Sequence, residues 1–315
     1  MAAARGAVLS AAVTRVASIG ECMVELSVAG PGHLTQTYGG DSLNTAVYLA
    51  RLGVAVDYVT ALGDDPFSDG MVAGWRAEGI GTDLVARLVG RLPGLYVIRA
   101  DVVGERSFHY WRSAAAARAM FRTPLTARVT EALPGYDLVY LTGNSLAILP
   151  PEDRARLVDL LAEVRARGGR VAFDSNYRLA NWEDMEAART WIGRASACAS
   201  IALPSFGDEA ALHGDADAAA TAARLRASGA QEVAVKNGPG PCTLAWPGGE
   251  AAVAARSVAR PVDTTAAGDA FNAGYLAARL AGDSPPEAAE AGHHLAATVI
   301  RHPGAIMPKE AMPAA

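Results

Sequence analysis

The sequence predicts an α/β fold in which helices cover a mainly parallel sheet. Short apolar runs of strand length alternate with longer runs of helical periodicity, the pattern that βαβ units produce. The chain has 315 residues, and 51% of them are hydrophobic, which is enough to bury the core of one large domain. One break in the alternation, between residues 92 and 112, predicts an inserted β-hairpin.

Composition narrows the classes of partner. The net charge is −5 and the pI about 5.7, so we expect small molecules as partners and neither nucleic acid nor membrane. Cys22, Cys198 and Cys242 are widely separated and form no C-x-x-C pair, which favours a reducing compartment over a structural zinc site. No apolar run reaches the ~18 residues of a transmembrane helix. Residues 1–12 show no clear cleavage pattern, so we expect a cytoplasmic protein.

The N-terminal segment begins the sheet. Residues 16–19 form a short apolar strand, and E-C-M-V-E-L follows with Glu21 and Glu25 interrupting the apolar residues, which predicts a half-exposed strand. Residues 56–63 then read as a buried strand, followed by a loop and a helix. These elements predict a parallel sheet.

A glycine pair precedes the first helix. Gly39 and Gly40 lead into L-N-T-A-V-Y-L-A-R-L-G, for which Asp41 or Ser42 is the expected N-cap. The glycines indicate either close approach of a ligand, with Asn44 hydrogen-bonding it, or simply a turn before a helix. The residues of this segment alone favour the two interpretations about equally.

The predicted hairpin carries a possible binding face. Its turn falls at residues 103–105, and on its second strand Tyr110 and Arg112 share one face, with Tyr96 on the partner strand. Tyrosine and arginine side chains together can hydrogen-bond and clamp a carboxylate. The alternative is an amphipathic hairpin with a solvated arginine.

Polar side chains also follow a later strand. The segment R-V-A-F-D-S-N-Y-R places Asp174, Asn176 and Arg178 at the carboxyl end of a predicted parallel strand. Ligands bind at such edges in open parallel sheets. Arg178 is therefore a second candidate partner for an anionic substrate.

Acidic residues open the next helix, after Ser205. Asp208 and Glu209 lie in its first turn, where acidic residues usually only favour a helix N-terminus. A second interpretation is that one of them orders water around Mg²⁺. Lys236 ends the following strand, near any phosphate tail at the sheet edge.

Residues 263–282, D-T-T-A-A-G-D-A-F-N-A-G-Y-L-A-A-R-L-A-G, predict a tight loop that delivers a helix N-terminus. The N–H groups of Ala266, Ala267, Gly268 and Asp269 would form an anion site there. A carboxylate beside an anion site opposes the ligand's charge, unless it takes a proton from the group that attacks the anion. Asp269 is thus the candidate base of a phosphoryl transfer.

Two segments resemble a known family in the expected order. D-T-T-A-A-G-D-A-F-N-A-G is similar to the C-terminal signature of the ribokinase-like (PfkB) carbohydrate kinases, and G-G-D-S-L-N-T-A-V-Y-L-A-R-L-G to their glycine-rich segment. E-C-M-V-E-L, R-L-P-G-L-Y, G-E-R-S-F-H-Y-W-R, F-D-S-N-Y-R and G-H-H-L-A-A-T-V-I-R-H-P-G-A-I-M-P resemble the 2-keto-3-deoxygluconate kinases within it. The resemblance covers residues 19–308.

This resemblance implies a ribokinase-like fold, with a Rossmann-like three-layer α/β/α core and a small β-sheet lid. One kinase domain, residues 1–315, would carry lid strands inserted at about 22–38 and 92–114, and a homo-oligomer would form through the lid. The implied reaction is ATP-dependent, Mg²⁺-assisted phosphorylation of the terminal hydroxyl of 2-keto-3-deoxygluconate, a sugar acid, to the 6-phosphate. A monovalent cation, K⁺, is a further candidate cofactor.

The resemblance also implies roles for individual residues. Asp269 matches the base, and Ala266, Ala267 and Gly268 match the anion site. The residues matching sugar and sugar-acid contacts are Gly39, Gly40, Asn44, Tyr96, Tyr110, Arg112 and Arg178. Those falling near the nucleotide are Lys236, Gly238, Ser205 and His293. Asp263 and Thr265 fall near the monovalent cation loop.

One departure concerns the metal. Many relatives have N-x-x-E where this chain has S-F-G-D, so Ser205 and Asp208 replace the residues that order the magnesium shell, and Asp208 would act through water. No G-x-x-x-x-G-K-[ST] occurs, which excludes a P-loop, and the six histidines show no metal-ligand spacing.

Three alternatives to this function stay open. The chain could phosphorylate ribose, fructose or 5-keto-2-deoxygluconate instead, or it could bind a sugar acid without turnover. A Rossmann dehydrogenase is disfavoured because I-G-E-C-M-V lacks G-x-G-x-x-G. We prefer an acidic keto-sugar, because two arginines and two tyrosines suit a carboxylate better than a neutral sugar.

Overall fold

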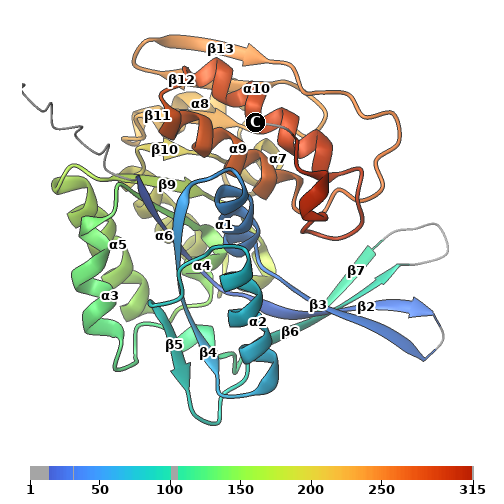
Figure 1. The fold of residues 1–315 in the computed structure, drawn as a ribbon. Coiled ribbons are helices and arrows are strands. Elements are labelled where there is room, and N and C mark those ends of the chain that lie inside the picture. The colour runs from blue at the N-terminus through green and yellow to red at the C-terminus, as the bar shows by residue number, and fades with distance from the viewer. Residues whose placement is uncertain (1–13, 31, 101–105, 314–315) are drawn as a thin grey trace, which may run out of the picture.

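A computed structural model describes residues 14–30, 32–100 and 106–313, and it confirms the predicted α/β class (Figure 1). Among these residues, nine strands form a main sheet in the order β13-β12-β11-β10-β9-β8-β1-β4-β5. The strands are β1 (Arg15–Ile19), β4 (Ala55–Gly63), β5 (Val85–Leu88), β8 (Leu138–Thr142), β9 (Arg170–Asp174), β10 (Ile201–Ala202), β11 (Glu232–Val235), β12 (Cys242–Trp246) and β13 (Gly249–Val253).

The main sheet is parallel from β5 to β11. At the other edge β12 and β13 add an antiparallel hairpin, which the sequence pattern did not predict. Alternate residues of the central strands enter different apolar clusters: Val139 and Leu141 pack on one face of the sheet, Leu138 and Tyr140 on the other. A strand buried on both faces reads as one continuous apolar run, which is why these strands were recognisable in the sequence.

Helices form a layer on each face of the main sheet. One layer contains α1 (Asp41–Arg51), α2 (Pro66–Ala77), α9 (Ala267–Ala281) and α10 (Pro285–Val299). The other contains α3 (Thr126–Ala132), α4 (Gly143–Ala147), α5 (Pro151–Ala166), α6 (Met185–Cys198), α7 (Phe206–His213) and α8 (Ala218–Ala227). Short 3-10 helices are η1 (Ala116–Ala119), η2 (Leu133–Gly135), η3 (Leu179–Asn181) and η4 (Lys309–Ala311). Of the helices in the described ranges, none has the length and apolar character needed to cross a bilayer.

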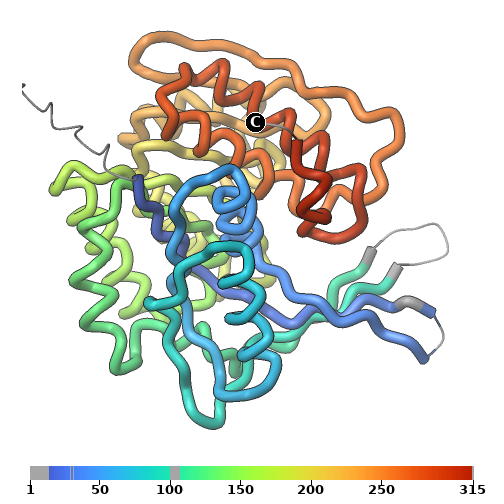
Figure 2. The backbone as a smooth tube through the Cα atoms, in the orientation of Figure 1, coloured from blue at the N-terminus to red at the C-terminus, as the bar shows by residue number. Residues whose placement is uncertain are grey.

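A second, four-stranded sheet projects from this body as a lid (Figures 1 and 2). Its order is β3-β2-β6-β7, with β2 (Met23–Gly30), β3 (His33–Gly39), β6 (Gly94–Ala100) and β7 (Arg106–Trp111). Two antiparallel hairpins, β2-β3 and β6-β7, meet along a parallel pair, β2 with β6. The predicted hairpin is confirmed, and its turn at residues 103–105 lies outside the described residues. The lid segments expected at about 22–38 and 92–114 fall on these strands.

The lid hangs over the carboxyl edge of the main sheet. Strand β1 ends at Ile19 and β2 begins at Met23, so the chain passes directly from the sheet edge into the lid. In the sheet, β1 lies between β8 and β4, so the strand order changes direction at β1. Open α/β sheets bind ligands at the carboxyl edge beside such a position. The half-exposed strand expected near Glu21 and Glu25 is wrong. Both residues are 5% exposed, because partners in the lid bind their carboxylates.

Candidate active site

A cavity of about 940 Å³ lies between the lid, the carboxyl edge of the main sheet and the loop before α9. Most of the predicted site residues line it: Gly40, Asn44, Tyr96, Tyr110, Arg112, Arg178, Ser205, Lys236, Asp263, Thr265, Ala266, Ala267, Gly268 and Asp269. Four predicted residues are not among those lining it: Gly39, Asp208, Gly238 and His293. The fold therefore gathers residues that are more than 200 positions apart in the chain.

Helix α9 begins with an unusual backbone turn. Ala266, its N-cap, has φ 59° and ψ 14°, a left-handed conformation that is strained for a residue with a side chain. The N–H of Ala267 donates to Thr264 O at 3.2 Å, so this group has an acceptor within the loop. The N–H groups of Gly268 and Asp269 lie in the first turn of α9, where N–H groups lack an acceptor within the helix. With the helix dipole, they can bind an anion.

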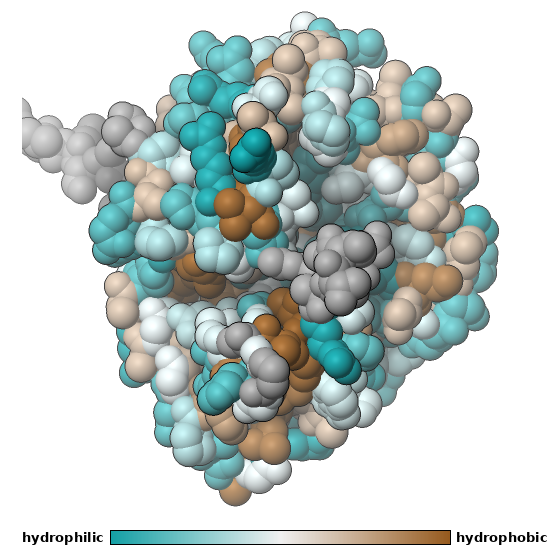
Figure 3. All heavy atoms as spheres, turned by 90° about the vertical axis from the view of Figure 1, so that its right-hand side faces the viewer, coloured by the Kyte–Doolittle hydropathy of each residue, from teal (hydrophilic) through white to brown (hydrophobic). Residues whose placement is uncertain are grey.

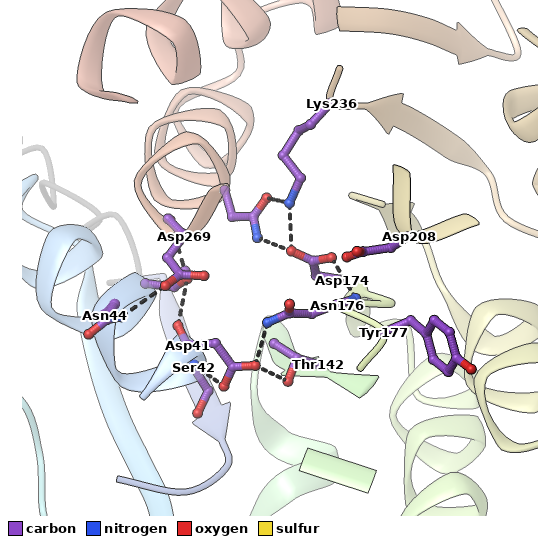
Figure 4. Close-up of polar contacts among 12 residues, drawn as sticks. Asp41, Ser42, Asn44, Thr142, Asp174, Asn176, Tyr177, Asp208, Lys236 and Asp269 are labelled. Carbon is purple, nitrogen blue, oxygen red and sulfur yellow. Dashed lines mark hydrogen bonds and ion pairs between the residues drawn. The ribbon is translucent and has the colours of Figure 1, made fainter. Parts of the chain in front are cut away.

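Asp269 lies at this helix start and is fixed to α1. Asn44 Nδ2 donates to Asp269 Oδ2 at 2.8 Å (Figure 4), and Thr45 Oγ1 donates to the Asp269 carbonyl oxygen at 3.2 Å. Burial, and then the negative charge of Asp41, raise the pKa of Asp269 to about 7. A carboxylate with such a pKa can take up a proton near neutral pH.

Lys236 brings a positive charge to the same place. Its Nζ donates to Asp174 Oδ2 at 2.5 Å and to Asn272 Oδ1 at 2.9 Å, and Asn272 Nδ2 also donates to Asp174 Oδ2 at 2.7 Å. Lys236 and Asp174 are both buried. A Cβ placed on Gly268 would lie 3.6 Å from Lys236 Nζ, so the ammonium group is next to the anion site.

Asp41 gathers the ends of three elements. Its Oδ2 accepts hydrogen bonds from Thr142 Oγ1 at 2.8 Å and Asn176 Nδ2 at 2.6 Å (Figure 4). It also accepts one from Asn144 Nδ2 at 2.9 Å. Asn176 has φ 31°, in the left-handed region. Its own N–H donates to Asp174 Oδ1 at 3.0 Å, so side chains on both sides hold this strained turn.

The glycine pair packs closely against neighbouring parts of the protein. A Cβ on Gly40 would lie 2.1 Å from the backbone oxygen of Glu21, and one on Gly39 would lie 2.7 Å from the Tyr96 hydroxyl. The expected N-cap is also wrong: Gly40 is the N-cap, and Asp41 is the first residue of α1. Tight packing of the lid against the helix start is thus the observed reason for glycine here.

The lid residues predicted to hold a carboxylate lie together and contact acidic residues. The Tyr96 hydroxyl donates to the carboxylate of Glu25, and the rings of Tyr96 and Tyr110 have centroids 5.8 Å apart. Arg112 forms an ion pair with the buried carboxylate of Glu21 through Nη2. Its Nε has no hydrogen-bond partner in the described ranges, so the guanidinium keeps a donor for another group.

Arg178 and Asp208, for which the sequence predicts separate roles, bind each other. Arg178 Nη1 donates to Asp208 Oδ1 at 2.8 Å and to the carbonyl oxygen of Tyr177 at 2.6 Å. Burial raises the pKa of Asp208, against the charge of Arg178. Ser205 is the N-cap residue of α7 and lines the cavity.

Two residues predicted near the nucleotide lie away from the cavity lining. His293 Nε2 is hydrogen-bonded to Val253 O at 3.2 Å, and its ring packs edge-on against Phe271. Gly238 has φ 53° in the turn after β11. Both predictions remain predictions, and neither residue lines the cavity.

The loop predicted to hold a monovalent cation is tied to the C-terminal segment. Asp263 Oδ1 accepts a hydrogen bond from the Thr265 N–H at 2.9 Å, and its Oδ2 accepts one from the Gly304 N–H at 2.7 Å. These bonds fix the shape of the loop that leads into α9.

The sequence interpretation missed several residues of the site. They are Glu21, Asp41, Thr142, Asn144 and Asn272. Most follow a strand at the carboxyl edge, which is a usable signal, because the carboxyl ends of parallel strands meet there. Asn272 lies four residues after Gly268, on the same helix face, and could have been found from that spacing.

A comparison with known protein families gives a match over nearly the whole chain. The model of the family described as "pfkB family carbohydrate kinase" matches residues 13–312. The chain belongs to the pfkB family of carbohydrate kinases. The predicted family resemblance is thereby confirmed.

Members of this family with curated names are similar over nearly the whole chain. The 2-dehydro-3-deoxygluconokinase of Dickeya dadantii is 46% identical over 307 residues, covering 95% of this chain and 98% of the relative. The enzyme of the same name from Escherichia coli K12 is 46% identical over 308 residues, covering 95% and 99%. The crystal structure of a fructokinase with bound ATP from Xylella fastidiosa shares the fold, with TM-score 0.79, 24% identity and 95% coverage of each chain.

Proposed function

We propose that this pfkB-family kinase transfers the γ-phosphoryl group of ATP to the terminal hydroxyl of 2-keto-3-deoxygluconate, giving the 6-phosphate. The observation that carries the proposal is one cavity that combines Asp269 and its anion site with two arginines, Arg112 and Arg178. Relatives named 2-dehydro-3-deoxygluconokinase, another name for this activity, support the choice of substrate.

Asp269 would act as the general base. Its carboxylate accepts the proton of the attacking hydroxyl, while the N–H groups of Gly268 and Asp269 stabilise charge on the transferred group. Lys236 Nζ, beside Gly268, adds positive charge where the phosphate tail would lie. Burial, and then the negative charge of Asp41, keep the Asp269 pKa high enough for proton uptake.

We propose that Mg²⁺ and ATP bind at the carboxyl edge of the main sheet, where carboxylates would hold the ion together with its waters. No cluster of three metal-binding side chains occurs in the part of the chain that the structure describes. Burial and, to a lesser extent, the negative charge of Asp174 raise the pKa of Asp208 at this edge. The two carboxylates would face an ion that keeps its waters and takes phosphate oxygens. When bound, Mg²⁺ neutralises charge on the phosphates. Ser205, Gly238 and His293 are proposed to contact the nucleotide.

The acid end of the sugar would lie under the lid. Arg112 and Arg178 supply positive charge, and Tyr96 and Tyr110 supply hydroxyl groups and ring surface. Asn44 and the backbone of Gly39 and Gly40 are proposed to contact the sugar. We also propose K⁺ at the loop of Asp263 and Thr265, for which activity in K⁺ and Na⁺ buffers is the comparison.

A substrate panel tests the function. ADP release is measured with 2-keto-3-deoxygluconate, its galactonate epimer, ribose, fructose and 5-keto-2-deoxygluconate. The proposal expects the highest kcat/KM for a 2-keto-3-deoxy sugar acid. A higher value for a neutral sugar would assign another kinase activity, and binding of the sugar acid without ADP release would indicate a silent binding protein.

The pH profile tests the role of Asp269. Because the base must be deprotonated, we expect kcat/KM to fall as pH decreases, with a midpoint near the pKa of about 7. The measurement needs Mg²⁺ in excess over ATP, so that titration of the free nucleotide does not contribute. A rate independent of pH between about 5.5 and 8.5 would contradict the assignment.

The lid also suggests self-association. Val28, Leu34, Phe108 and Trp111 on its strands are 48%, 55%, 41% and 62% exposed, and Figure 3 shows hydrophobic residues on the face toward which the lid points. We propose a homo-oligomer formed through this lid surface. Light scattering should show more than one chain per particle, and Leu34→Glu should yield a monomer. Val89→Glu, at an exposed site after β5, is the matched control and should leave the mass unchanged.

We propose a cytoplasmic location, because the reaction consumes ATP. The free thiols of Cys22, Cys198 and Cys242 fit a reducing compartment. Activity recovered in the membrane or extracellular fraction of the source cells would contradict this proposal.

A further inference from the structure

Asn272 is a polar residue in the apolar core of the protein. It lies on α9 and is 0% exposed, while most buried residues of that helix are apolar, Phe271, Tyr275 and Leu276 among them. It is not among the residues that line the cavity. A buried amide lowers stability unless its polar atoms form hydrogen bonds, and a leucine of similar size would fill this place without that demand. Packing alone therefore does not explain an asparagine here.

The amide of Asn272 is occupied by three neighbours. Its Oδ1 accepts a hydrogen bond from Lys236 Nζ at 2.9 Å. Its Nδ2 donates to Asp174 Oδ2 at 2.7 Å and to the Tyr140 hydroxyl at 3.0 Å. Only one orientation of the amide fits, because the reverse would direct its NH₂ group at the ammonium group of Lys236. Since both N–H groups are used and the residue lies outside the cavity lining, Asn272 does not bind a ligand directly.

Lys236 has a fixed main chain and a long side chain. Its N–H donates to Pro204 O and its carbonyl oxygen accepts from the Phe206 N–H, both at 2.8 Å, so the main chain is held at the start of α7. The four-carbon side chain is flexible unless its ammonium group is held as well. Asp174 Oδ2 gives that group an opposite charge, and Asn272 Oδ1 gives it a second, directional contact (Figure 4).

These two contacts determine where the ammonium group lies. It is next to the anion site, since a Cβ on Gly268 would lie 3.6 Å from Lys236 Nζ. An ammonium group has three N–H donors, and Asp174 and Asn272 accept two of them. The third is left for an anion at the start of α9. Without Asn272, the ammonium group could rotate about its contact with Asp174 and move away from this position.

We propose that Asn272 is a positioning residue for the phosphoryl transfer: its Oδ1 holds the Lys236 ammonium group beside the anion site, where it contacts the phosphates of ATP. The inference rests on the proposed function and deepens it, because it gives a role to a residue that touches neither substrate. The competing view is that Asn272 only joins α9 to the ends of β8 and β9.

A double-mutant cycle with Lys236 separates the two views. The wild type, Asn272→Leu, Lys236→Gln and the double variant are compared by steady-state kinetics in ATP and in the sugar acid. Leucine is close to asparagine in size and has no polar group. Lys236→Gln removes the charge but keeps an amide donor for Asp174. Tyr140→Phe is the matched control, because it removes a hydroxyl from the other side of Asn272 and leaves the other two hydrogen bonds of the amide in place.

Asn272→Leu should lower kcat/KM for ATP by about 10- to 100-fold, because a charged group displaced by about 1 Å loses much of its effect on the reaction. The KM for the sugar acid should change little. Lys236→Gln should lose at least as much, and adding Asn272→Leu to it should cost less than about threefold more. Tyr140→Phe should stay within about threefold of the wild type. Asn272→Ala serves in the same cycle if Asn272→Leu does not fold.

Three results would overturn the inference. One is an equal loss for Asn272→Leu with and without Lys236, because a purely structural role does not depend on the lysine. Another is a loss of the same size in Tyr140→Phe. The third is an unchanged kcat/KM for ATP in Lys236→Gln, since the lysine would then have no contact with the phosphates.

Failure of the proposed function is a separate result. In that case the wild type would turn over no 2-keto-3-deoxy sugar acid in the substrate panel. The cycle is therefore repeated with the affinity for a non-hydrolysable ATP analogue, measured by calorimetry with Mg²⁺, which does not depend on which sugar is phosphorylated. A weaker affinity in Asn272→Leu that disappears as a difference in the Lys236→Gln background would support the role of Asn272 for any sugar substrate, and equal losses in both backgrounds would reject it.

Discussion

Asp269→Asn is expected to lower kcat by about 10²–10⁴-fold while both substrates still bind, because the amide cannot accept the hydroxyl proton. The substitution keeps the size of the side chain, and an amide oxygen can still accept the hydrogen bond from Asn44 Nδ2. Steady-state kinetics gives kcat, and calorimetry with a non-hydrolysable ATP analogue and the sugar acid gives the two affinities. Asp283→Asn, at an exposed site beyond the end of α9, is the matched control.

A second readout does not depend on turnover. Because the folded-state pKa of Asp269 is raised, the folded protein binds a proton that the unfolded chain has already lost, and this stabilisation disappears as pH rises toward 7. Asp269→Asn should therefore increase Tm more at pH 8 than at pH 5. A kcat close to that of the wild type, or an equal change in Tm at both pH values, would contradict the assignment of Asp269 as a buried base.

Arg112→Ala is expected to raise KM for the sugar acid by about 10²-fold or more, because it removes one partner of a charge-assisted contact under the lid. The KM for ATP should change little, since Lys236 and α9, which are proposed to contact the phosphates, lie outside the lid. The same substitution leaves the Glu21 carboxylate buried without its ion-pair partner, which commonly costs about 3–5 kcal/mol of stability.

Binding and stability can be separated with two further variants. Glu21→Gln combined with Arg112→Ala removes both charges, so it should restore much of the lost Tm without restoring the KM. Arg112→Lys keeps a charge for Glu21 but lacks the planar fork that suits a carboxylate, so we expect an intermediate KM. An unchanged KM for the sugar acid in the double variant would refute the role of Arg112.

Hydrophobic periodicity and turn residues are properties of short segments of sequence, and they were sufficient to predict the class of fold. The mainly apolar runs of β4 and β8 indicate strands buried on both faces, and the loop before α9 predicts an anion site and its base. The inserted hairpin is equally visible, because its strands alternate without a helix between them. The antiparallel edge of β12 and β13 was missed, since a short strand after a Gly/Pro loop leaves a weak pattern.

The sequence did not predict which charged side chains pair with one another. Arg112 pairs with Glu21 over 91 positions, and Arg178 pairs with Asp208 over 30. No local spacing brings such residues together, because the register of the lid and the order of strands in the sheet decide which side chains meet. For the same reason, Glu21 and Glu25 appeared exposed in the alternation of their strand but are buried by contacts from the neighbouring strands.

The sequence by itself predicted an α/β kinase with a base at the start of α9, since both predictions follow from patterns within single segments. Only the tertiary structure decided what surrounds Asp269. It placed Asp41 beside Asp269, set Lys236 against Gly268 and made Gly40 necessary for the packing of the lid. These are contacts between distant segments, and their energies depend on burial and on distances that exist only after the chain has folded.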